Sequence, residues 1–75
     1  MNKMQEKFSK QLKKALDIRE MKAIELSKKT GIPKSSISQY MSGYTMPRLD
    51  KFFVIADTLG VDAKWLLGFD VPIEK

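Results

Sequence analysis

Apolar positions recur along the chain with the spacing of helices rather than of strands. Phe8, Leu12, Ala15 and Leu16 follow one another at i, i+4, i+7 and i+8, which places them on one helical face. No segment shows the sustained alternation that a half-buried strand requires. Similar stripes, most of them separated by short segments containing glycine or proline, predict five helices, at about residues 5–19, 22–30, 33–41, 48–59 and 63–67. We therefore expect an all-α domain over residues 1–68, with residues 69–75 as a tail or the start of a linker.

The residues at the expected helix ends support these boundaries. Gly31, Gly60 and Gly68 follow the second, fourth and fifth helices, where glycine commonly ends a helix in a left-handed conformation. Asp62 is a good N-cap for the fifth helix. Pro33 is expected to open the third helix, because its missing N–H costs nothing in the first turn.

Residues 23–42 meet the requirements of a helix-turn-helix, in which two helices cross steeply through a short turn. Ser27 is small where the helices approach, and four positions later Gly31 tolerates the positive φ of the turn. The residues that the first helix of the pair is expected to bury are Ile24, Leu26 and Ser27. The apolar residues expected to fix the second helix are Ile32, Ile37 and Tyr40.

With those positions buried, the outward face of the second helix is polar and made mostly of short side chains. It consists of Lys34, Ser35, Ser36, Ser38, Gln39 and Ser42. An ordinary solvated helix favours strong helix formers such as Glu, Lys and Ala, whereas serine weakens a helix. Short side chains with a few long donors suit a helix that enters a DNA major groove about 12 Å wide. The alternative is a plain solvated face, and the agreement of the whole spacing favours the DNA-binding interpretation.

The segment from residue 8 to residue 68 resembles the five-helix domain of the lambda-repressor-like, xenobiotic-response-element family. The matching residues are Leu26-Ser27, Gly31-Ile32, Ser36-Ile37-Ser38, Gly43, Pro47, Leu49, Ala56, Leu59-Gly60-Val61 and Trp65-Leu66-Leu67-Gly68. The ending from Trp65 to Pro72 is most similar to the N-terminal domain of lysogeny repressors from temperate phages of Gram-positive bacteria. The resemblance implies a DNA-binding transcriptional repressor or regulator, active in the bacterial cytoplasm.

The resemblance also implies which residues contact DNA. With the third helix in the major groove, base contacts are expected from Lys34, Ser35, Ser36, Ser38 and Gln39. Phosphate contacts are expected from Lys22, Ser42, Tyr44, Thr45 and Arg48. The alternative for Tyr44 is a loop aromatic that covers the core.

The chain departs from the family pattern at the start of its second helix. The family usually has Thr-Gln there, with the threonine as cap and the glutamine bracing the recognition helix against a phosphate. Here those positions hold Lys22 and Ala23, so a charge remains but the bracing amide is lost. Pro33 and Arg48 likewise replace the serine-type caps usual before the third and fourth helices.

Charge agrees with an anionic partner. The net charge is +5, but residues 1–34 carry ten Lys/Arg and four Asp/Glu, giving +6, while residues 35–75 carry four and five, giving −1. Such a basic half suggests nucleic acid first and a membrane surface second. A lysine-rich solvated face would give the same balance.

Composition argues against an enzyme and against a metal or cofactor site. The chain has no cysteine and no histidine, which removes the commonest metal ligands and the commonest general base. A serine with a lysine base is the remaining nucleophile arrangement. Lys34 and Ser35 are adjacent on a helix and cannot face each other.

The expected partner is an operator in double-stranded DNA, with an inverted repeat read by a homodimer whose contact is weak without DNA. We expect the fifth helix and the tail to form the dimer surface. The alternative function is that of an antitoxin or another protein-interaction module with the same fold, and an antirepressor protein is a further possible partner. No membrane association is expected.

Overall fold

The computed structural model describes residues 3–74, and these form five helices and no strand. The helices are α1 (Lys3–Ile18), α2 (Ala23–Thr30), α3 (Lys34–Ser42), α4 (Leu49–Leu59) and α5 (Ala63–Leu66). The predicted all-α class with five helices is confirmed, and each predicted helix end lies within two residues of the observed one. None of these helices has both the length and the apolar character needed to cross a membrane.

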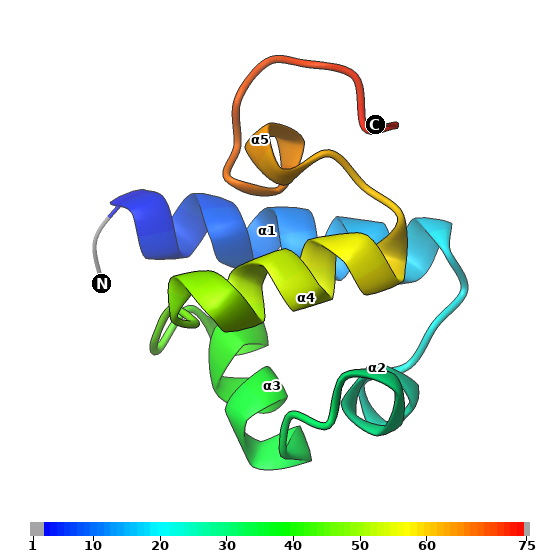
Figure 1. The fold of residues 1–75 in the computed structure, drawn as a ribbon. Helices are drawn as coiled ribbons and strands as arrows, with labels where there is room; N and C mark the ends of the chain where they lie inside the picture. The colour runs from blue at the N-terminus through cyan, green and yellow to red at the C-terminus, as the bar shows by residue number, and fades with distance from the viewer. Residues whose placement is uncertain (1–2, 75) are drawn as a thin grey trace.

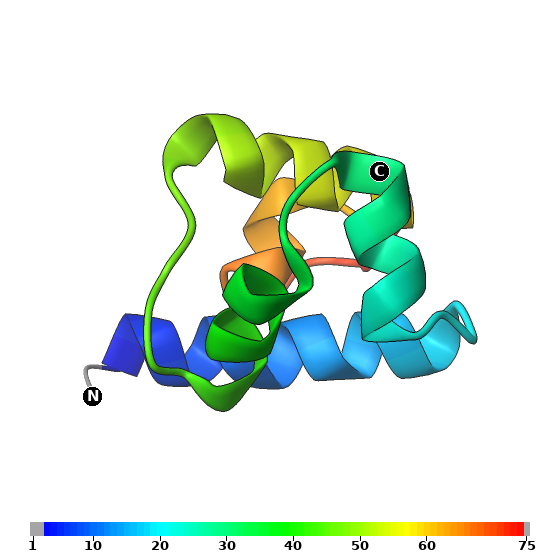
Figure 2. The ribbon, with the colours of Figure 1, turned by 90° about the horizontal axis from the view of Figure 1, so that it is seen from below.

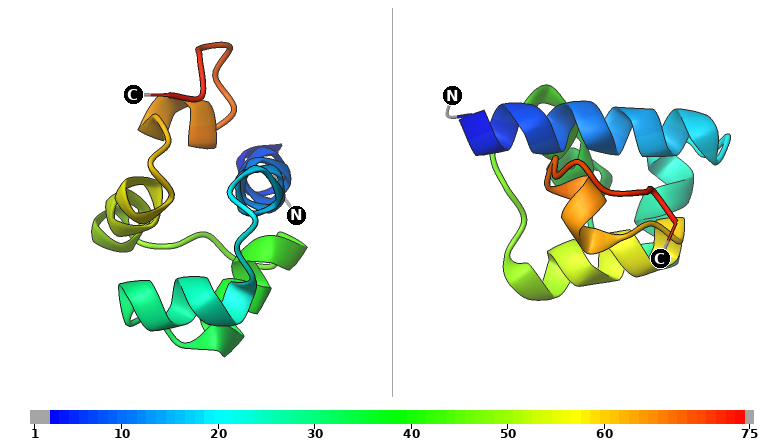
Figure 3. Two further views of the ribbon diagram at one scale, coloured as in Figure 1. Left: turned by 90° about the vertical axis from the view of Figure 1, so that its right-hand side faces the viewer. Right: turned by 90° about the horizontal axis from the view of Figure 1, so that it is seen from above.

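The helices are arranged in three layers. In Figure 1, α2 and α3 form the lower layer, α1 and α4 the middle layer, and α5 with the tail the upper one. The left view of Figure 3, in which α1 and α4 are seen nearly end-on, shows the same order. The third helix and the C-terminal tail therefore lie on opposite sides of the α1–α4 layer.

Glycines in the left-handed conformation end three of the helices. Gly31, Gly43 and Gly60 have φ values of 77°, 80° and 66°. Their N–H groups donate to carbonyls of the preceding turn, as expected for this type of helix end. Asp62 caps α5 as predicted, because its carboxylate accepts hydrogen bonds from the N–H groups of Lys64 at 2.8 Å and Trp65 at 3.3 Å.

Pro33 lies outside the third helix and does not open it. Its ψ of 142° is extended, so the helix begins at Lys34. The Pro33 carbonyl still accepts hydrogen bonds from the N–H groups of Ser36 and Ile37. The residue therefore occupies the N-cap position, where its carbonyl starts the helix although its backbone is not helical.

The core is built around the predicted apolar stripe of α1. Phe8 is fully buried and lies between two other rings, with centroids 6.3 Å from Tyr40 of α3 and 5.8 Å from Phe52 of α4. The other buried apolar residues are Leu12, Ala15, Leu16, Leu26, Ile32, Ile37, Ile55, Ala56, Leu59, Val61, Trp65 and Leu66. One cluster thus joins all five helices.

The prediction that α2 buries Ile24 is wrong. Ile24 is 44% exposed, whereas Leu26 is fully buried and Ala23 packs partly against the core. Residues two apart on a helix point to different sides, so Ile24 and Leu26 cannot share a buried face. Ala23 and Leu26, three apart, can.

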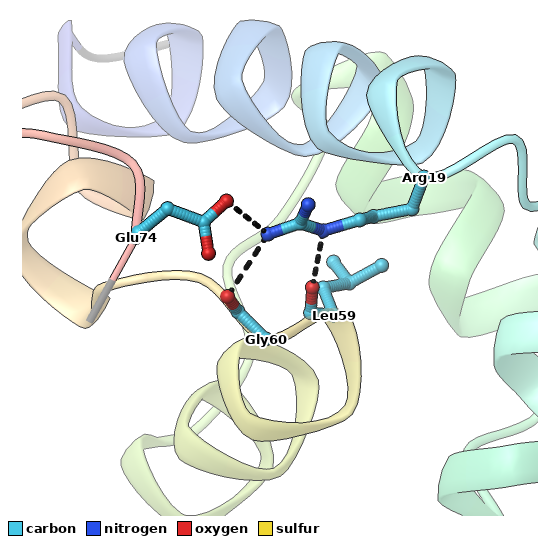
Figure 4. A network of polar contacts seen from close by, with 4 residues as sticks. All are labelled: Arg19, Leu59, Gly60 and Glu74. Carbon is cyan, nitrogen blue, oxygen red and sulfur yellow. Dashed lines mark hydrogen bonds and ion pairs between the residues drawn. The ribbon is translucent and has the colours of Figure 1, made fainter.

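The tail returns to the loop between α4 and α5 and is attached by Arg19, which directly follows α1 (Figure 4). The Arg19 guanidinium donates from Nε to the Leu59 carbonyl at 2.8 Å and from Nη2 to the Gly60 carbonyl at 3.0 Å. Nη2 also lies 2.9 Å from Oε1 of Glu74. The Asp62 N–H donates to the Ile73 carbonyl at 2.7 Å. The domain boundary at residue 68 and the linker interpretation stay predictions.

We predict that Arg19→Met lowers the free energy of unfolding by about 1–2 kcal/mol, because the carbonyls of Leu59 and Gly60 lose a charged donor. Glu74→Gln, which alters the solvent-exposed partner alone, should cost less than about 0.5 kcal/mol. Urea denaturation of both variants measures the difference. Equal losses would mean that the ion pair, and not the carbonyl contacts, holds the end of α4.

Candidate nucleic-acid interface

Hydroxyl groups fix the turn between α2 and α3. Ser27 Oγ donates to the Ile32 carbonyl at 2.6 Å, and the Gly31 N–H donates to the Ser27 carbonyl at 2.9 Å. Thr30 Oγ1 donates to the Leu26 carbonyl at 2.8 Å and accepts from the Ile32 N–H at 3.2 Å. The small size of Ser27 is predicted from the sequence, whereas the hydrogen bonds of Ser27 and Thr30 are not. Hydroxyls bond neighbouring backbone groups readily, so two of them beside Gly31 were the available signal.

The third helix is held by its buried apolar side and, near its C-terminal end, by α1. Ile37 is fully buried and Tyr40 is 8% exposed. Ser9 of α1, itself buried, donates from Oγ to the Met41 carbonyl at 2.6 Å. This contact is not predicted from the sequence, because a serine within a lysine-rich helix is usually solvated. The rotation and the position of α3 are both fixed by these contacts.

The opposite side of α3 is open to solvent. Figure 2 views the molecule from this side, with α2 and α3 nearest the viewer. The predicted base-contact residues Lys34, Ser35, Ser38 and Gln39 are exposed, while Ser36 is half-buried. A helix turns about 100° per residue, so Ser35 lies near the centre of this face, with Ser38 and Gln39 on either side of it and Ser36 at one edge. Their roles as base contacts remain predictions.

A shallow hollow brings together residues predicted to contact bases and residues predicted to contact phosphates. It is lined by Ser38, Gln39, Ser42 and Tyr44. Tyr44 is 75% exposed, so the alternative that it covers the core is wrong. Its backbone is fixed, because its N–H donates to the Gln39 carbonyl at 3.0 Å and its carbonyl accepts from Gln5 Nε2 at 3.3 Å. The phenol therefore projects from a rigid loop beside Gln39.

Three other predicted phosphate contacts, Lys22, Thr45 and Arg48, do not line the hollow. Lys22 and Arg48 are exposed and precede α2 and α4, and neither side chain caps its helix. Both are thus available to an external anion. Thr45 is half-buried, and Ser42 Oγ donates to the Gln39 carbonyl at 3.0 Å. Ser42 must rotate away from this bond before it can donate to a phosphate.

The site contains hydrogen-bond donors and basic side chains but no arrangement suited to a metal ion. Within residues 3–74, no group of three or more His, Cys, Asp or Glu side chains could hold a metal. The chemistry of the exposed face of α3 is hydrogen bonding from hydroxyl, amide and ammonium groups. Such groups match the acceptors on base edges and phosphates.

Comparison with known proteins agrees with this geometry. A family model described as helix-turn-helix matches residues 10–66, which include all five helices in whole or in large part. No curated protein matches the chain.

We predict that Ser27→Ala lowers the free energy of unfolding by about 1–2 kcal/mol, since it leaves the Ile32 carbonyl without its donor inside the turn. Ser35→Ala is the matched control on the exposed face of α3 and should change stability by less than about 0.5 kcal/mol. Thermal or urea unfolding without DNA compares the two. A Ser27→Ala protein as stable as wild type would show that small size alone is required there.

Proposed function

Since the chain belongs to the helix-turn-helix family of the xenobiotic-response-element type, whose members are sequence-specific DNA-binding regulators of transcription, we propose that it is a repressor that binds an inverted-repeat operator. The family is one of regulatory domains and is not typically enzymatic. The similarity of residues 65–72 to lysogeny repressors supports a role in a phage or prophage of a bacterial host.

The observation that carries this proposal is the contrast between the two sides of α3. One side is buried through Ile37 and Tyr40, and the other presents an exposed row of short polar side chains with two long donors, Lys34 and Gln39. A short polar row lets the helix approach base edges closely. Because the buried side is fixed, those donors stay in one register.

We assign base reading to the N-terminal and central part of α3. Gln39 pairs with adenine through its amide, and Lys34 reaches a guanine or a neighbouring phosphate. Ser35 and Ser38 are short enough to contact base edges directly, and Ser36 at the edge of the face contacts the backbone or an adjacent base.

Phosphate contacts supply much of the affinity in this proposal. Lys22, Ser42, Tyr44, Thr45 and Arg48 position the domain from both sides of α3. The chain has Ala23 where a bracing glutamine is usual, so contacts outside the helix become more important. The net charge of +5 favours this electrostatic contribution.

The test is selection by the wild-type chain from a pool of random-sequence duplexes, followed by titration of the enriched duplex at several salt concentrations. We expect enrichment of an inverted repeat and binding that weakens steeply with salt, because each neutralised phosphate releases counterions. No enrichment, or binding that is independent of salt, would contradict the proposal and favour a protein partner instead.

We predict that Gln39→Ala weakens binding to the enriched duplex by about 1–3 kcal/mol and changes binding to random DNA little, because it removes a base contact. Arg48→Ala, the control for a phosphate contact, should weaken binding to both duplexes similarly and reduce the salt slope by about 1. Fluorescence anisotropy on both duplexes measures the two effects. Equal losses on both duplexes for Gln39→Ala would exclude a base-reading role.

A further inference from the structure

An apolar surface on α4 is not used by the DNA-facing side of the molecule. Leu49 is 70% exposed, Phe53 52% and Val54 41%. Beside the Phe53 ring lies a hollow lined by Phe53, Val54, Ala56, Asp57, Val61 and Ala63. Exposed apolar residues scattered singly are ordinary, but three on one helix beside a hollow form a patch that suits a protein contact. We call Phe53, Val54 and this hollow the α4 edge.

From this arrangement, and resting on the proposed function, we propose that the α4 edge is the surface through which a second copy of this chain binds on the operator. The contact is isologous, so the Phe53 ring of each copy enters the hollow of the other. A two-fold contact needs a projection and a matching recess on the same surface, and the α4 edge has both.

The dimensions of the domain imply that two copies bound to adjacent half-sites contact each other along an edge. The Cα atoms extend over 29 × 26 × 22 Å. Side chains reach about 3 Å beyond the Cα trace on each side, so the two longer dimensions become roughly 32–35 Å. Half-sites one helical turn apart place two recognition helices about 34 Å from each other. Two copies side by side on one face of DNA therefore touch.

The position of the edges restricts which surface is available. Figure 2, seen from the side of α2 and α3, shows α1 along one edge, α4 along the opposite edge and α3 between them. The surface of α5 and the tail lies on the far side of the α1–α4 layer from α3 (Figures 1 and 3). That surface, expected from the sequence to form the dimer, points away from the DNA rather than toward a neighbour on it.

Charge distinguishes the two edges. The exposed charged residues of α1 are Lys3, Lys7, Lys10, Lys13 and Lys14 with Glu6 and Asp17, so the five lysines outnumber the two carboxylates. Two copies meeting there would bring like charges together, which is unfavourable. The exposed charged residues of α4 are Asp50, Lys51 and Asp57, so the net charge beside the apolar residues is smaller than on α1. A second copy fits the α4 edge better than the α1 edge.

The absence of cysteine from the chain allows a direct test by crosslinking. Val54→Cys introduces a single thiol on the α4 edge, and Phe69→Cys introduces one on the tail, where Phe69 is 56% exposed. Each variant is treated with a short bis-maleimide on the duplex enriched by the wild-type chain, and on a duplex with one half-site. We expect Val54→Cys to form a covalent dimer on the full duplex and little on the half-site, and Phe69→Cys to form none. Crosslinking through residue 69, or through neither residue on the full duplex, would overturn the proposal.

Binding measurements separate the interface from the DNA contacts. Phe53→Ser should weaken binding to the full duplex about tenfold or more and leave half-site binding unchanged, because a buried interface aromatic is lost. Phe69→Ser, an equally exposed phenylalanine, should change neither. An equal loss on both duplexes for Phe53→Ser would overturn the proposal.

Failure of the proposed function has a different signature, since the wild-type chain would then enrich no duplex. Sedimentation equilibrium at high protein concentration then decides the interface by itself. Self-association that Phe53→Ser weakens and Phe69→Ser leaves intact would support the α4 edge, and any other pattern would reject it.

Discussion

Polar side chains of α1, and of Arg19 directly after it, donate hydrogen bonds to C-terminal carbonyls of three other helices, and the arrangement of the domain depends on this. The last carbonyls of a helix have no partner within it and need one elsewhere. Ser9 donates to Met41 in α3, Gln11 to Trp65 in α5 at 2.8 Å, and Arg19 to Leu59 in α4. Ser9 and Gln11 lie on α1, and Arg19 directly follows its last residue. The ends of α3, α4 and α5 are thereby fixed relative to one another, over a core too small to fix them by apolar contact alone.

The orientation of α3 follows from this frame and from two buried side chains. Ile37 and Tyr40 set the rotation of the helix, with Tyr40 against the ring of Phe8. The Ser9–Met41 bond sets its displacement along α1. A polar face is useful for recognition when its donors keep a constant register, because each displaced donor leaves a base acceptor unpaired. Residues on the buried side of α3 therefore determine which donors its exposed side can present.

Much of the fold could be predicted from the sequence, because helix periodicity and glycine stops are local signals. The stripe of Phe8 and Leu12, the stop at Gly31 and the cap at Asp62 all depend on residues within one or two turns. The exposure of Ile24 and the burial of the Ser9 hydroxyl depend on which other helix each residue contacts. A local sequence pattern does not predict such tertiary contacts. In the candidate site, the exposure of Lys34, Ser35, Ser38 and Gln39 could be predicted once Ile37 and Tyr40 were taken as buried. The hollow shared by Gln39 and Tyr44 could not, since it requires the loop after Gly43 to turn back beside α3.

The composition of α3 makes its structure dependent on the rest of the domain. The helix from Lys34 to Ser42 contains four serines, Ser35, Ser36, Ser38 and Ser42. Serine has a lower helix propensity than Ala, Glu or Lys. A helix this short is marginal by itself in water. No side chain caps its N-terminus, so Ile37, Tyr40 and the Ser9 bond must keep it folded. Because the support lies entirely on the buried side, the exposed positions are free to carry weak helix formers. The exposed side can therefore carry a row of short donors. A helix that had to be stable by itself would need strong helix formers with long, charged side chains there, and these would prevent close approach to a DNA groove.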